Sequence, residues 1–193
     1  MISNSVFTLL LERLASFYPL SAGLVNALRP FLKEHDGLKG EILLQKGKKG
    51  DQVWFICEGH AREIGVDLEN GNEMTSWFWF KEDFIFAYPG FFSQQPAESA
   101  VELIEECRLI EMDYEDFILL RDTFPEVWPL VESIRHYYDH LRLTHLKDLQ
   151  SLSAKVKYLK FYHEHKSLFN IARHKDIANF LGIKDDGFNR YNS

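Results

Sequence analysis

The stretch ILLQKGKKGDQVWFICEGHARE (42–63) alternates short strand-like runs with turns that contain glycine. The runs are rich in Ile, Val, Trp and Phe, and the turns hold Gly47, Gly50 and Gly59. Aromatic and β-branched residues favour strands, whereas glycine beside charged residues favours the turns of hairpins. The stretch therefore predicts antiparallel strands joined by tight turns.

The same pattern continues on both sides of this stretch, across residues 40–113. Glu69-Asn70-Gly71-Asn72 is a strong hairpin signal, because Asn-Gly suits the tight turn between two antiparallel strands. Several short strands at this spacing favour an antiparallel barrel or sandwich. We predict strands at 41–44, 53–58, 61–67, 73–80, 100–105 and 107–112.

Helical periodicity replaces the strand pattern outside this region, with apolar residues recurring three and four positions apart. The predicted helical segments are 5–17, 21–33, 114–120, a long segment that begins near Pro125, and 154–165. The predicted fold class is therefore α+β. It comprises an N-terminal antiparallel β-roll of the double-stranded β-helix or jelly-roll type with flanking helices, a long helix, and a small helical C-terminal domain.

The long helical segment carries a narrow apolar seam, of the kind that two helices use in a coiled contact. Its members are Val127, Val131, Ile134, Tyr138, Leu141 and His145. This spacing favours a dimerisation helix and a homodimer. A stripe that packs against the chain's own barrel would give the same spacing, so both interpretations remain open.

Near the C-terminus, HKDIANFLGIKDDGFNR (174–190) has the spacing of two short helices that cross at a tight turn. Ala178 allows close approach of the second helix, Gly182 suits a left-handed turn, and Phe188 completes a small apolar core. This pattern predicts a helix-turn-helix. Other helical hairpins that contain alanine and glycine share it.

The charge is unevenly distributed along the chain. The net charge is −7, yet residues 155–193 hold eight Lys and Arg against four acidic residues. Residues 1–154 hold 14 basic and 25 acidic residues. The acidic body would repel a polyanion, whereas the basic C-terminal segment could approach one. A solvated helical face is the alternative interpretation of the basic segment.

Composition and motifs argue against several other classes. No apolar run reaches the ~20 residues of a membrane helix, and no basic region precedes the apolar opening stretch, so we expect a cytoplasmic protein without a membrane partner. Cys57 and Cys107 stand alone and are expected to be buried. No nucleophile elbow, P-loop or dinucleotide motif occurs, and His60 lacks the companion ligands of a metal-binding cupin. We therefore expect no enzyme, no metal and no cofactor.

The order of these elements resembles the Crp/Fnr family of bacterial transcription regulators. The most specific similarities are the stretch 42–63, EDFIF (82–86), and IANFLGI with the terminal FNR. The resemblance implies a cyclic nucleotide-binding-like sensor domain at 1–124, a dimerisation helix at 125–150 and a DNA-binding domain at 151–193. It implies double-stranded DNA and a second copy of the chain as partners.

The family's nucleotide-binding members hold the ribose with a Gly-Glu pair and the cyclic phosphate with an Arg-Ser pair. Aligned on EDFI (82–85), these pairs fall on Phe86-Ala87 and Glu98-Ser99. A carboxylate thus replaces the guanidinium, and a buried phosphate needs a cation. We therefore predict that the roll binds neither cyclic AMP nor cyclic GMP.

The aromatic residues around this cassette indicate either a filled core or a pocket for an apolar or aromatic ligand. The cluster comprises Trp77, Trp79, Phe84, Phe86, Tyr88, Phe91 and Phe92. We expect the pocket of a small-molecule effector, of unidentified chemistry, to involve Trp77, Trp79, Phe86, Ala87, Tyr88, Glu98 and Ser99.

The resemblance also implies a recognition helix at about 185–192. In it, Asn189 and Arg190 would contact base edges, and Asp186 would accept a hydrogen bond from cytosine. Arg173, Lys175 and Lys184 would contact phosphates. Only Tyr191, Asn192 and Ser193 follow, where many family members have a β-hairpin wing. The alternative is therefore a ligand-sensing dimer that acts through protein contacts, with weak or lost DNA binding.

Overall fold

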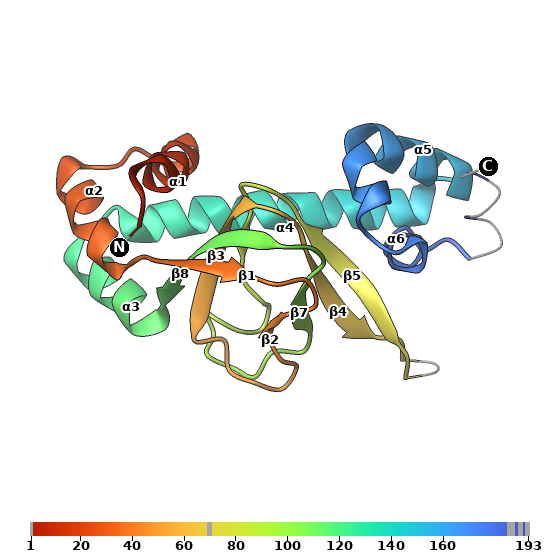
Figure 1. Cartoon of the computed structure of the whole chain (residues 1–193), viewed down its shortest axis with the longest axis horizontal. Helices are drawn as coiled ribbons and strands as arrows, with labels where there is room; N and C mark the ends of the chain where they lie inside the picture. The colour runs from red at the N-terminus through yellow and green to blue at the C-terminus, as the bar shows by residue number, and fades with distance from the viewer. Residues whose placement is uncertain (1, 69–70, 185–187, 189–190, 192–193) are drawn as a thin grey trace.

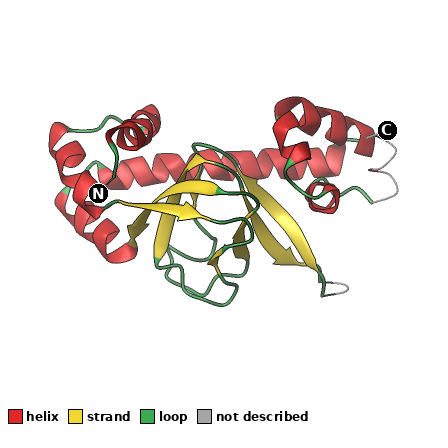
Figure 2. Cartoon of the chain, in the orientation of Figure 1, coloured by secondary structure: helices red, strands yellow, loops and turns green. Residues whose placement is uncertain are grey.

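The computed structural model describes residues 2–68, 71–184, 188 and 191 of the chain. A β-roll occupies the middle of the molecule, and one long helix runs along it from end to end (Figure 1). Helices gather at both ends of the roll, the N-terminal ones at one end and the C-terminal ones at the other (Figure 2). The long helix therefore connects two helical groups that lie far apart.

The roll consists of two four-stranded antiparallel sheets. One sheet has the order β1 (Lys33–Gly37), β8 (Cys107–Asp113), β3 (Gln52–Glu58) and β6 (Phe84–Ile85). The other has the order β2 (Ile42–Leu44), β7 (Ala100–Leu103), β4 (Ala61–Val66) and β5 (Glu73–Trp79). Ile56, Leu103 and Leu109 are fully buried between them. The predicted antiparallel roll is confirmed.

The sequence did not predict two of the strands, β1 and β6. The expected helix 21–33 ends early: α2 (Ala22–Leu28) passes into the short 3-10 helix η1 (Arg29–Phe31), which contains Pro30, and β1 follows. β1 has the polar sequence KEHDG because it is an edge strand that pairs with β8 alone. β6 has only two residues, which is too short for a period of two to be visible.

The remaining α-helices follow the predicted segments closely, whereas the short 3-10 helix η2 (Lys166–Asn170) was not predicted. These α-helices are α1 (Asn4–Phe17), α3 (Tyr114–Thr123), α4 (Val127–Ser151), α5 (Ala154–Glu164) and α6 (His174–Phe180). Within the part of the chain that the structure describes, no helix combines the length and apolarity that crossing a bilayer requires.

The apolar face of α4 packs against the chain itself. Val127, Val131, Ile134 and Tyr138 expose 8% of their surface or less in the single chain. Leu141 is half-buried, and the His145 ring stacks on Phe180 of α6 with 4.0 Å between ring centroids. Of the two interpretations of the seam, this placement favours the stripe that packs against the chain's own roll, because the apolar surface of these residues already has a partner within one chain.

Candidate functional site

Glu98 and Ser99, which align with the phosphate-binding pair of the Crp/Fnr family, lie in different environments. Ser99, just before β7, is buried, and its hydroxyl donates to Oε1 of Glu63 on β4 at 3.0 Å. Oε2 of Glu63 accepts a hydrogen bond from Arg142 of α4 at 2.7 Å. Glu98 is exposed. The place expected for a phosphate therefore presents a buried carboxylate that is already paired with α4.

The space between the roll and α4 is filled by aromatic side chains. Trp79 is fully buried and packs edge-on against Tyr138 of α4, with 5.3 Å between ring centroids. The guanidinium of Arg142 lies 4.8 Å from the ring centroid of Trp77. Ala87 is buried, whereas Tyr88 is 75% exposed. The residues that we expected to form one effector pocket therefore do not line a common cavity.

Asp83, in the EDFIF segment, connects the turn between β5 and β6 to α4 through hydrogen bonds. Its Oδ1 accepts a hydrogen bond from the Tyr138 hydroxyl at 3.0 Å, and its Oδ2 accepts one from the Phe80 N–H at 2.7 Å. The Tyr138 oxygen in turn accepts from the Phe84 N–H at 2.7 Å. Burial raises the pKa of Asp83 to about 6. The group is thus a buried carboxyl whose hydrogen bonds join two elements.

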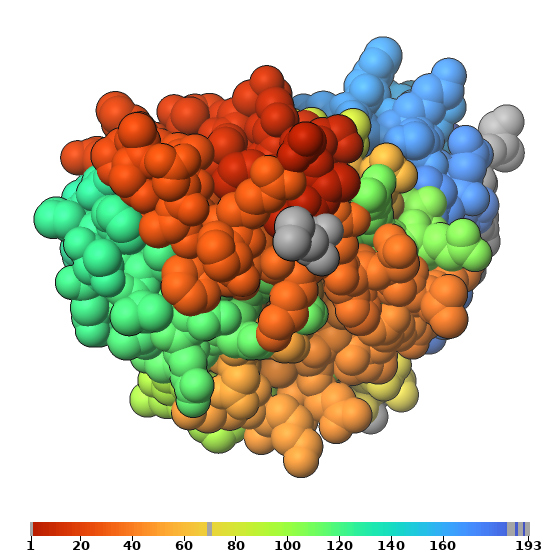
Figure 3. Space-filling view, turned by 60° about the vertical axis from the view of Figure 1, so that its left-hand side comes forward, coloured from red at the N-terminus to blue at the C-terminus, as the bar shows by residue number. Residues whose placement is uncertain are grey.

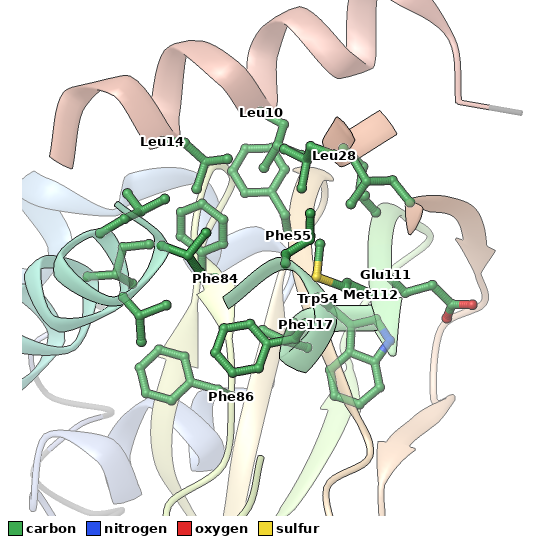
Figure 4. A pocket seen from close by; sticks show the side chains of 18 of the residues that line it. Leu10, Leu14, Leu28, Trp54, Phe55, Phe84, Phe86, Glu111, Met112 and Phe117 are labelled. Carbon is green, nitrogen blue, oxygen red and sulfur yellow. The ribbon is translucent and has the colours of Figure 1, made fainter. Parts of the chain in front are cut away.

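A separate apolar cavity of about 120 Å³ lies at the other end of the roll, beneath the N-terminal helices (Figure 4). Figure 4 shows Leu10 and Leu14 of α1 above it, with Phe84, Phe86 and Phe117 around it. In the space-filling view, the red N-terminal helices cover this end of the molecule, next to the green to turquoise region of α3 and α4 (Figure 3). Sequence reasoning missed the cavity, because its walls come from helices and strands far apart in the chain.

The aromatic cluster is therefore divided between two environments. Phe84, Phe86, Phe91 and Phe92 line the apolar cavity. Trp79 belongs to the packed core instead. Of the expected effector-pocket residues, only Phe86 contacts the cavity.

The structure confirms the left-handed turn that the sequence predicts at Gly182, whereas most of the predicted second helix, at about 185–192, lies outside the described residues. α6 ends at a left-handed Gly182 with φ of 57°. The N–H groups of Gly182 and Ile183 donate to the carbonyls of Asn179 and Ala178, at 3.0 and 2.9 Å, which satisfies the free carbonyls at the helix end. Phe188 is buried and stacks on Phe169. Asp186, Asn189 and Arg190 lie outside the described residues.

The three basic residues that we assigned to phosphate contacts are all on the surface. Lys175 and Lys184 are exposed. Arg173 has a side chain that is 70% exposed, and its Nε donates to Oδ2 of Asp176 at 2.8 Å. Arg173 is thus partly neutralised by a carboxylate one turn further along α6.

A buried ion pair joins α6 to the roll. Nη1 of Arg62 on β4 donates to Oδ1 of Asp176 at 2.8 Å and to the Thr75 hydroxyl at 3.1 Å. Arg62 and Asp176 expose only 5% and 4% of their surfaces. Glu102 of β7 pairs with the same guanidinium. Sequence reasoning missed this group, since nothing in a linear pattern relates charges 114 residues apart.

Aromatic packing reinforces this docking of α6 on β5. The ring of Phe180 lies 5.8 Å from Trp77 and 5.3 Å from Phe78, both in edge-to-face orientation. Phe161 of α5 lies 5.1 Å from Phe180. The C-terminal helices thus share a small core with the roll.

A cleft of about 490 Å³ lies alongside this contact, between β5, α4, α5 and α6. Lys160 and Asp148, which form an ion pair, lie at its edge, and the buried Lys157 donates to the Gly182 carbonyl at 3.4 Å. Burial lowers the pKa of Lys157. The cleft is lined by both acidic and basic groups, so it favours neither an anionic nor a cationic ligand.

Cys57 and Cys107 are buried, as predicted, and burial raises the pKa of each thiol to about 11. Such thiols are inert at neutral pH, because the nucleophile is the thiolate. Among the described residues, no group of three or more His, Cys, Asp or Glu is placed to hold a metal ion.

The part of the chain that contains most of the roll matches a known protein family. The family model described as "Cyclic nucleotide-binding domain" matches residues 38–123. The potassium channel SKOR of Arabidopsis thaliana is 24% identical over 123 residues, which are 64% of this chain and 15% of the channel. The rice potassium channel KOR1 is 27% identical over the same share of this chain and 14% of its own length. The chain therefore spans only a small part of these curated relatives.

Solved structures resemble the chain over most of its length. A chain from Eubacterium rectale assigned to the crp/fnr family is 16% identical with a TM-score of 0.72, covering 91% of this chain and 85% of that one. The c-di-GMP responsive global regulator CLP of Xanthomonas campestris is 14% identical with a TM-score of 0.67, covering 89% of both. The Thermus thermophilus catabolite activator protein is 19% identical with a TM-score of 0.57, covering 93% and 84%. Residues 38–123 therefore match the cyclic nucleotide-binding domain family, within a chain whose fold is that of Crp/Fnr-type regulators.

Proposed function

We propose that this chain is a dimeric, DNA-binding transcriptional regulator of the Crp/Fnr type. The observation that carries the proposal is the order of the elements: a cyclic nucleotide-binding-type roll, then the 25-residue helix α4, then α6 and its left-handed Gly182 turn. In this proposal residues 1–124 sense an effector, 125–150 hold the dimer, and 151–193 bind DNA. Solved structures of regulators that share the fold cover about nine-tenths of the chain.

The C-terminal unit offers the positive charge that DNA binding requires. Lys175 and Lys184 flank the Gly182 turn and are exposed, so their ammonium groups are free to approach phosphates. Arg190 and Asn189 are assigned to base edges, with Asp186 beside them, on the resemblance of the sequence alone. Affinity resting on a few phosphate contacts falls steeply as salt rises.

For the dimer, we propose the outer face of α4 in place of the buried seam. Trp128, Leu143 and Leu146 expose 50%, 57% and 48% of their surfaces. Trp128 and Leu146 are 18 residues apart, which is five helical turns, so they lie on one side of the helix. These exposed apolar side chains, with Glu132, Arg135 and Asp139 between them on the same face, are suited to contact with a second copy of the same helix.

We also propose that the roll binds neither cyclic AMP nor cyclic GMP. Ser99 stands at an expected phosphate position and is hydrogen-bonded to the buried Glu63, whose carboxylate is already paired with Arg142. Placing a phosphate there would bring two anions together in a buried site. Isothermal titration should show no binding of either nucleotide, and micromolar affinity for one of them would refute this part of the proposal.

DNA binding is tested by mobility shift against genomic fragments at two salt concentrations. Some fragments should bind, with a steep loss of affinity at the higher salt, and Arg190→Ala should remove the preference among them. Lys48→Ala is the matched control, since Lys48 is an exposed base on the roll, and it should bind as the wild type does.

The competing function is a sensor dimer that acts through protein contacts. The observation that favours it is the acidic body, because residues 1–154 hold 25 acidic against 14 basic residues. Sedimentation measured on the same samples separates the two. Intact dimers that bind no fragment at either salt concentration would favour the protein-contact function over the regulator.

A further inference from the structure

We infer that the apolar cavity beneath the N-terminal helices is a binding site for a small, uncharged, apolar molecule of about the size of benzene. Its volume is about 120 Å³, and its walls come from α1, α2, α3, α4, β3, β6 and β8. In another protein, an engineered cavity of about 150 Å³ lined by Leu, Ile and Phe stays dry and binds benzene. The two cavities are similar in size and in lining.

The lining chemistry decides the class of ligand. The side chains that face the cavity are Leu, Val, Ile, Phe, Met and Trp, and most of them are buried. Glu111 borders the cavity, but Figure 4 shows its carboxylate directed away from it. A charged or strongly polar ligand would lose its hydration and gain no hydrogen bond here. Water is disfavoured for the same reason, so an apolar occupant meets little competition.

The position of the cavity separates it from the nucleotide position of the roll. Glu63, Ser99 and Arg142 are absent from its walls, whereas α4 contributes Val127, Leu130, Val131 and Ile134. An occupant would therefore touch the helix that continues into the C-terminal helices. The binding itself does not depend on whether the chain recognises DNA.

Thermal unfolding of the full chain in increasing benzene tests the inference. A ligand that binds only the folded state raises the melting temperature in a saturable way, by about 3–6 °C at ten times the dissociation constant for a chain of this size. Val131→Phe places a ring in the cavity and should abolish the rise. Retention of the fold in this variant is checked by circular dichroism.

A second pair of variants decides the matter even if Val131→Phe does not fold. Leu14→Ala enlarges the cavity and should lower the melting temperature, whereas Leu119→Ala truncates an exposed side chain of α3 that does not line the cavity. Benzene should raise the melting temperature of Leu119→Ala as much as that of the wild type, and that of Leu14→Ala by more. No saturable rise in the wild type, or equal rises in these two variants, would overturn the inference.

Discussion

At the residue scale, Asp83 shows how burial and hydrogen bonding set a charge. Its carboxyl is surrounded by the turn between β5 and β6 and by α4, and three hydrogen bonds connect it, Tyr138 and the backbone. Burial is the largest influence, and it raises the pKa to about 6 even though the two donated hydrogen bonds favour the ionised form. Around neutral pH the folded protein thus holds a poorly solvated carboxylate.

The stability that Asp83 contributes should therefore fall as the pH rises. An unfolded Asp titrates near 4, so below that pH Asp83 is protonated in both the folded and the unfolded state. Its titration then does not reduce the free energy of unfolding. Between about pH 4 and pH 6, ionisation of Asp83 stabilises the unfolded state, while the folded state stays protonated, so the free energy of unfolding falls. About two pKa units correspond to roughly 3 kcal/mol in the free energy of unfolding. Asp83→Asn keeps an acceptor for Phe80 and a partner for Tyr138, and it removes the titration.

The measurement is the difference in unfolding free energy between Asp83→Asn and the wild type, from urea curves at pH 4 to 7. As the pH rises, the free energy of unfolding of Asp83→Asn should increase relative to that of the wild type. Taking the difference cancels His165 and His145, whose pKa values burial lowers, to about 4 for His165, and whose influence on stability has the opposite sign. A difference that does not change with pH would contradict the prediction.

The sequence reveals little of such a group in advance. EDFIF (82–86) was recognisable as a motif, but Tyr138 lies 55 residues further along, in a helix that was itself predicted correctly. Which side chain meets which depends on how α4 sits on the roll. That position is set by packing in three dimensions rather than by a local pattern.

At the scale of elements, periodicity predicted which face of α4 is apolar but not what covers it. A helix that packs on its own roll and a helix that pairs with a second copy both repeat apolar residues every three or four positions. The structure places Tyr138 and its neighbours against the roll, and it leaves Leu143 and Leu146 outside. Strand β1 was missed for the converse reason, since its polar residues give no apolar pattern.

The ion pair between Arg62 and Asp176 is the element-scale contact that is easiest to test. Among the described residues, Asp176→Ala leaves the buried guanidinium of Arg62 with Glu102 as its one charged partner, which should cost on the order of 3 kcal/mol. Asp148→Ala is the matched control. It breaks a pair with Lys160 whose side chains are 27% and 39% exposed, so it should cost less than about 1 kcal/mol.

Urea unfolding of both variants measures these costs, and hydrogen exchange locates them. Loss of protection in Asp176→Ala should concentrate in α6, because this pair fixes that helix to β4. Equal and small losses in the two variants would show that the buried pair does not hold α6 on the roll.

At the scale of the whole molecule, the C-terminal helices are joined to the rest by the chain connection from α4 and by contacts of both α5 and α6 with β5. α4 leads into them as a continuous helix along the roll, and α6 docks back on β5 (Figure 1). The rings of Trp77, Phe78 and Phe180 meet at this docking surface. A small helical unit has little core of its own, so this shared surface must supply much of its stability.

The chain should therefore unfold in one cooperative transition. All four tryptophans precede residue 152, so fluorescence reports on the roll and α4, whereas far-ultraviolet circular dichroism also reports on α5 and α6. The two signals should change together in the wild type. Phe180→Ala removes the ring at the centre of the docking surface, and the helical signal should then be lost at a lower urea concentration than the fluorescence signal.

Leu109→Ala separates this effect from simple destabilisation. Leu109 is fully buried in β8, so its truncation should cost about 2–5 kcal/mol, yet it leaves the docking surface intact. Both signals should therefore shift to lower urea and remain coincident. If the signals stayed coincident in Phe180→Ala as well, the ring of Phe180 would not be what couples the two parts. The coupling would then rest on the buried pair of Arg62 and Asp176 together with the stacking of Phe161 on Phe78 and of His165 on Phe80.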